Sequence, residues 1–99
     1  MIVSVVYPNH EGARFDSTYY RDRHAKLAAE IWQPERVDLI EGQPMGGAPS
    51  PFALIAHFHF ASPEALGAAM ANPRIGELQV DVPNFTDITP QLMIGRALG

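Results

Sequence analysis

The chain has 99 residues, no cysteine, and a formal charge of −4 from seven Lys and Arg against eleven Asp and Glu. This length holds one domain, and a composition of 46% apolar and 18% charged residues excludes a disordered chain, while no apolar run approaches the ~18 residues of a membrane span. Without cysteine there is no disulfide, thiolate metal site or cysteine nucleophile, and the acidic charge argues against binding to nucleic acid or to an anionic membrane.

The N-terminal segment predicts a strand. Residues 2–7 are mostly β-branched and stop at Pro8, where a turn begins. Because no basic lead precedes this short apolar run, it does not have the pattern of a signal peptide. We therefore expect a cytoplasmic protein without membrane association.

A helix is expected to follow from Asp16 to Pro34. Asp16 is placed to cap its N-terminus, and Phe15 and Tyr20 stand where a hydrophobic staple would close. The helical period predicts one inward stripe, consisting of Tyr20, His24, Leu27 and Ile31.

Two strands are predicted in the middle of the chain. Residues 36–41 alternate as in a half-exposed strand near a sheet edge, and residues 42–51 are a Gly- and Pro-rich loop. Residues 52–60 form the strongest strand pattern, with apolar residues on both faces and Ile55, His57 and His59 together on one of them.

The last third predicts two helical pieces and a final strand. Ser62 and Pro63 give an N-cap and a first helical position for a helix through Met70. After a break at residues 72–73, a second piece turns Ile75, Leu78 and Val82 inward and ends at Pro83, and residues 91–97 form the last strand.

The resulting order is β-α-β-β-α-β, which is typical of a ferredoxin-like α+β domain spanning residues 1–99. In this fold two helices cover one face of a four-stranded antiparallel sheet. The apolar character of both faces of residues 52–60, together with Val3, Val5 and the alternate side of residues 92–94, predicts that the other face is also buried. We expect a homodimer whose sheets face each other.

Three segments together resemble the EthD family. They are residues 15–24 (Phe-Asp-x-x-Tyr-Tyr-x-x-x-His), the strand and cap at residues 56–64, and residues 81–90 around Pro-Asn-Phe-Thr-Asp. The resemblance runs over nearly the whole chain and implies a dimeric α+β barrel. Similar small barrels act on aromatic or enolisable compounds, mostly without a metal or an organic cofactor, so we expect no cofactor. The resemblance also implies that His24 faces a cleft between the helices and the sheet.

His24 and Tyr20 are the expected catalytic residues. An imidazole that titrates near neutrality can take a proton from an acidic C–H or O–H group and return it elsewhere, and Tyr20 would orient a substrate hydroxyl or carbonyl. The alternative for His24 is a core histidine bonded to a backbone carbonyl, and for Tyr20 plain packing.

The expected substrate-binding residues surround this cleft: Tyr19, Phe15, Ile55, His57, His59 and Phe85. His57 and His59 leave the same strand face and could hold a metal only if a third ligand approached, so we expect no metal site and favour sheet lining or a dimer contact. Asp81 and Asp87 are interpreted as loop residues that cap backbone groups.

We therefore expect a small homodimer that binds a hydrophobic or aromatic molecule, such as a polyketide-like compound or a lactone, and performs proton-transfer chemistry on it. This chemistry would be isomerisation, cyclisation, decarboxylation or oxygenation. The alternative is a non-catalytic protein that holds a hydrophobic metabolite for an oxygenase pathway. Haem binding, a third possibility, would give Soret absorbance, which we do not expect.

Overall fold

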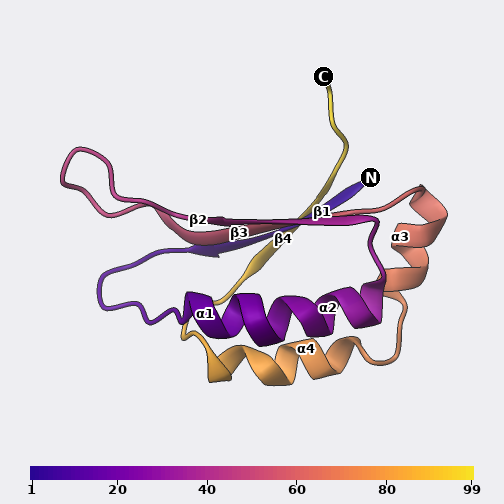
Figure 1. The fold of residues 1–99 in the computed structure, drawn as a ribbon, viewed down its shortest axis with the longest axis horizontal. Coiled ribbons are helices and arrows are strands. Elements are labelled where there is room, and N and C mark those ends of the chain that lie inside the picture. The colour runs from indigo at the N-terminus through magenta and orange to yellow at the C-terminus, as the bar shows by residue number, and fades with distance from the viewer.

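A computed structural model describes all residues from Met1 to Gly99. Four antiparallel strands form one sheet in the order β2-β3-β1-β4, and the helices lie together on one side of it (Figure 1). This arrangement confirms the expected ferredoxin-like α+β fold. The strands are β1 (Ile2–Pro8), β2 (Arg36–Glu41), β3 (Phe52–His59) and β4 (Gln91–Gly95). The helices are α1 (Ser17–Tyr19), α2 (Ala25–Trp32), α3 (Pro63–Met70) and α4 (Ile75–Asp81).

The first helix is one continuous rod built from three pieces, because a π-helical turn at Tyr20–His24 joins α1 to α2. Asp16 caps the rod, since its Oδ1 atom accepts the backbone N–H of Tyr19 at 3.0 Å. The rings of Phe15 and Tyr20 lie 5.7 Å apart, which confirms the hydrophobic staple. Gln33, in the left-handed conformation with φ of 50°, ends the helix before Pro34.

The inward stripe of this helix differs from the expected one. Tyr20, His24 and Ile31 are buried as predicted, but Leu27 is only half-buried, and Ala28 and Trp32 are buried instead. The π turn explains the difference, because its extra residue rotates every later position around the helix axis. The buried residues that follow Tyr20 at intervals of four are therefore His24, Ala28 and Trp32.

The later elements follow the prediction with small shifts of boundary. Ser62 caps α3, and a 3-10 turn at Val82–Asn84 continues α4 into the following loop. The last strand ends at Gly95 rather than at residue 97. Gly95 pairs with Ile2, the first residue of β1, so the pairing of the two strands ends there.

The core lies between the sheet and the helices. Val3 and Val5 face the helices, so the expectation that they contribute to the free face of the sheet is wrong. Their strand partners Phe58 and Ala56 are buried on the same side. The alternation of β1 therefore gives the free face Ile2, Ser4 and Val6.

The free face is mixed rather than apolar. Val6, Ile55 and Ile40 form one apolar row across β1, β3 and β2. The next row is polar, with Ser4 Oγ 2.7 Å from His57 Nδ1, and its third member Asp38 reaches diagonally to His59, with Oδ2 2.8 Å from Nε2. Among the helices, none is long and apolar enough to cross a membrane.

Candidate functional site

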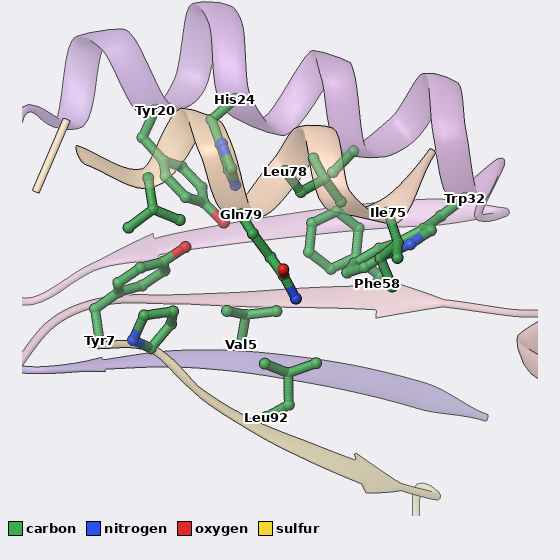
Figure 2. A pocket seen from close by; sticks show the side chains of 13 residues that line it. Val5, Tyr7, Tyr20, His24, Trp32, Phe58, Ile75, Leu78, Gln79 and Leu92 are labelled. Atoms are coloured by element: carbon green, nitrogen blue, oxygen red, sulfur yellow. The ribbon is translucent and has the colours of Figure 1, made fainter. Parts of the chain in front are cut away.

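A mainly apolar cavity of about 110 Å³ lies between the sheet and helices α2 and α4 (Figure 2). For scale, an engineered cavity of ~150 Å³ in another protein binds benzene. Gln79 and Leu92 are the exposed lining residues, so the mouth of the cavity lies between α4 and β4. The lining residues come from both layers of the fold: Val5, Tyr7, Tyr20, His24, Ala28, Trp32, Phe58, Ile75, Leu78, Gln79, Val82, Pro90 and Leu92.

A cluster of aromatic rings closes the end of the cavity where His24 lies. Phe85 is fully buried, and its ring lies 4.6 Å from the His24 imidazole and 5.2 Å from the Tyr20 ring. Phe15 packs behind it at 5.5 Å. The two segments that carry these phenylalanines are tied together, since the Asp16 N–H donates to the Phe85 carbonyl at 2.8 Å. This hydrogen bond therefore joins the start of the first helix to the end of the 3-10 turn, next to His24.

Asp81 holds His24 in position. The Nδ1 atom of His24 lies 2.8 Å from Oδ2 of Asp81, and both side chains are largely buried. The other carboxylate oxygen accepts hydrogen bonds from the Tyr19 hydroxyl at 2.7 Å and from the Asn84 amide at 3.0 Å. Three side chains, two from the first helix and one from the 3-10 turn, thus converge on the carboxylate of α4.

This arrangement determines which nitrogen of His24 can act as a base. Burial of the imidazole lowers the pKa of His24 below its ordinary value of 6.5, although the hydrogen bond to Asp81 opposes the shift. Burial alone would raise the pKa of Asp81, but the hydrogen bonds from Tyr19, Asn84 and His24 outweigh it and hold that pKa below its usual range. An ionised carboxylate only accepts, so Nδ1 carries the proton and Nε2 keeps a lone pair.

Tyr7 and Tyr20 provide neutral hydroxyl groups at the same end of the cavity. Figure 2 shows their hydroxyl groups facing each other below His24. Burial raises the pKa of Tyr7 to about 12, partly offset by a hydrogen bond with Tyr20, and burial raises the pKa of Tyr20 further. A neutral phenol can donate its O–H, so these two residues can offer a hydrogen-bond donor to a ligand.

The structure brings together some of the residues predicted for the site and separates others. Tyr20 and His24 line the cavity, while Phe15, Tyr19 and Phe85 form the layer behind them. Ile55, His57 and His59 lie on the free face of the sheet and do not reach this cavity. No group of three or more His, Asp or Glu side chains stands close enough to hold a metal ion.

Sequence reasoning missed Asp81 as a site residue. The structure places it at the end of α4, where it holds His24, rather than in a loop that caps backbone groups. Asp87 does fit the capping interpretation, since it accepts the Arg14 backbone N–H at 3.0 Å. The spacing of Leu78 and Asp81, one turn apart on the same face of a helix, was the signal that could have found Asp81.

Comparison with known proteins identifies the family of this chain. The model of the EthD domain family matches residues 10–89, a range that contains both His24 and Asp81. The chain belongs to the EthD family. No curated protein matches it.

Two solved structures with the EthD description are similar to this chain. An EthD-like protein from Ralstonia eutropha shares 34% identity with a TM-score of 0.87, and the match covers 99% of this chain and 91% of that protein. An ethyl tert-butyl ether D (EthD) family protein from Bacillus halodurans shares 21% identity with a TM-score of 0.75, over 98% of this chain and 97% of that one.

The fold extends to more distant proteins. A protein from Arabidopsis thaliana shares 11% identity with a TM-score of 0.62, and the match covers 99% of this chain and 97% of that chain. At this identity the likeness concerns the fold alone.

Proposed function

We propose that this EthD protein binds a small aromatic or enolisable molecule in the cavity and transfers a proton on it, with His24 as the base. The observation that carries the proposal is the 2.8 Å contact between His24 Nδ1 and Asp81 Oδ2, which leaves the lone pair of Nε2 for a ligand. A core histidine bonded to a backbone carbonyl would need no buried carboxylate. The charged partner instead favours a base that must become an imidazolium during the reaction.

The proposed step moves one proton and no other atom. Nε2 of His24 takes a proton from an acidic C–H or O–H group, the electron pair stays on the substrate as an enolate or phenolate, and the imidazolium returns the proton to the same or another atom. Asp81 stabilises the imidazolium, while an O–H of the Tyr7 and Tyr20 pair donates to the substrate oxygen that gains charge. The isomerisation or cyclisation named above would begin with such a transfer.

We also propose that the protein works as a homodimer with the free face of the sheet inside. The apolar row of Val6, Ile55 and Ile40 supports this, because Ile40 on the edge strand is 52% exposed in the single chain. Met93 of β4, which pairs with Ser4 and therefore lies on the same face, is 61% exposed. Apolar surface of this kind is typical of a contact between subunits.

Solvent deuterium exchange tests the proton transfer directly. Small cyclic and aromatic ketones and lactones are incubated with the protein in D₂O, and incorporation of deuterium at the acidic carbon is followed by NMR. His24→Gln is expected to slow exchange by about 10² to 10⁴. His10→Gln, which replaces an exposed histidine outside the cavity, serves as the control and is expected to exchange at the wild-type rate. Binding without any His24-dependent exchange would overturn the catalytic role and favour a carrier of hydrophobic metabolites.

A further inference from the structure

The end of the cavity opposite Tyr20 holds a hydrogen-bond donor that nothing in the chain satisfies. Trp32 lines the cavity and is 7% exposed, and its Nε1–H is the one buried side-chain nitrogen or oxygen group without a partner. Buried polar groups in folded proteins are nearly always paired, so an orphan beside a cavity calls for an explanation.

The immediate surroundings of the indole are apolar. The ring of Phe58 lies 5.0 Å away in an edge-to-face arrangement, and Ile75 is another apolar residue that lines the same cavity. An aromatic face is at best a weak acceptor compared with an oxygen atom. The chain therefore supplies the donor at this end of the cavity without supplying its acceptor.

The two polar ends of the cavity are set apart by the helix itself. His24, the last residue of the π-helical turn, and Trp32, the last residue of α2, are eight residues apart, which corresponds to about 12 Å of rise between their backbones. Both residues line the cavity, so a molecule that reaches the two side chains must carry its polar atoms on opposite sides of its apolar part. A benzene ring with a hydroxyl at one end and a carbonyl at the para position carries its two oxygens in this way.

We propose that the ligand of this cavity is a single-ring aromatic compound with an ionisable hydroxyl directed to His24 and a carbonyl oxygen that accepts the Trp32 indole N–H. This inference rests on the proposed function, because the hydroxyl end is placed by His24. It adds the substrate class: a para-acylphenol or a close relative, rather than an arene with one polar group. Trp32 is here a specificity residue, since it contacts the ligand away from the reacting atoms.

The volume and lining of the cavity fit such a molecule. About 110 Å³ accommodates one ring, and the walls between the two ends are aliphatic or aromatic, including Leu78 and Val5. Substituents beyond the carbonyl would leave through the mouth at Gln79 and Leu92, where the lining is exposed. A site that is built to donate a hydrogen bond discriminates strongly against an analogue that lacks the acceptor.

Two matched probes test the proposal: 4-hydroxyacetophenone and 4-isopropylphenol, which differ by a carbonyl oxygen in place of a methyl group. Binding to the wild type, Trp32→Phe and His24→Gln is measured by calorimetry at about pH 6, where both phenols are neutral. The wild type is expected to prefer the ketone by about tenfold to a hundredfold, and Trp32→Phe is expected to bring the two affinities within about threefold.

A second measurement needs no variant. The chain has a single tryptophan, so its indole gives one cross-peak in a ¹H–¹⁵N spectrum. The ketone is expected to move this proton resonance downfield, whereas 4-isopropylphenol is not expected to do so. An unmoved resonance with bound ketone, or an equal preference in wild type and Trp32→Phe, would overturn the proposal while leaving the role of His24 intact. Failure of both probes to bind, or equal binding to His24→Gln, would overturn the proposed function as well.

Discussion

The Oδ2 atom of Asp81 lies 2.8 Å from the Nδ1 atom of His24, although 57 residues separate the two along the chain. The contact joins the end of α4 to the π-helical turn at the start of the first helix. Because the carboxylate can only accept, the contact fixes the tautomer of the imidazole and leaves Nε2 with a free lone pair in a residue that lines the cavity. His24 and Asp81 therefore each shift the pKa of the other, and these shifts can be measured.

The first prediction concerns the titration of His24. Burial lowers its pKa, so the NMR midpoint of the His24 imidazole is expected below the ordinary value of 6.5. Asp81 favours the charged imidazolium, so Asp81→Asn is expected to lower that midpoint further. A midpoint above 6.5 in the wild type, or one that rises in Asp81→Asn, would contradict this description of the pair.

The fold was largely predictable from the sequence because its signals are local. Caps at Asp16 and Ser62 and the alternation in residues 52–60 each act within a few residues, and the structure contains the elements they predicted. The partial exposure of Leu27 was not predictable in this way. It results from the π turn at Tyr20–His24, which rotates the later residues around the helix axis and leaves no recognisable sequence pattern.

The site was only half predictable for a related reason. Tyr20 and His24 were found because they share one helix, but Asp81 is joined to them by tertiary packing alone. Strand parity explains the separation of His57 and His59 from the cavity. Alternate residues of β3 face opposite sides of the sheet. Phe58, which stands between His57 and His59 in the sequence, faces the helices, so the two histidines face away from the cavity.

The second prediction is a pH dependence of stability. His24 has a lowered pKa in the folded protein, so its contribution to the free energy of unfolding is complete above 6.5 and is lost as the pH falls through the folded-state pKa. The lowered pKa of Asp81 acts only in a more acidic window, below its ordinary value of 3.8. Urea unfolding between about pH 7.5 and pH 5.5 is expected to show a smaller loss in His24→Gln than in the wild type. Parallel curves for the two proteins would contradict the assigned burial of the imidazole.

The third prediction separates the inner wall of the cavity from its mouth. Leu78 is 6% exposed, so Leu78→Ala is expected to lower the free energy of unfolding by about 2–5 kcal/mol while it enlarges the cavity. Leu92, at the mouth, is 55% exposed, and Leu92→Ala is expected to cost about 0.5 kcal/mol or less. Denaturant titrations of both variants provide the comparison, and equal losses would show that the two residues are buried alike in solution.

The fourth prediction tests the homodimer through the centre of the free sheet face. Ile55 lies between Val6 and Ile40 in the apolar row, so a charge at this position would be buried in a dimer but solvated in a monomer. Ile55→Lys is expected to change the solution mass from that of two chains to that of one, with an unchanged circular dichroism spectrum. Glu64→Lys, which introduces the same side chain on the exposed surface of α3, is the matched control and is expected to stay dimeric. Light scattering measures the mass, and a wild type that is monomeric at every concentration, or an Ile55→Lys variant that stays dimeric, would show that the free face is not the subunit contact.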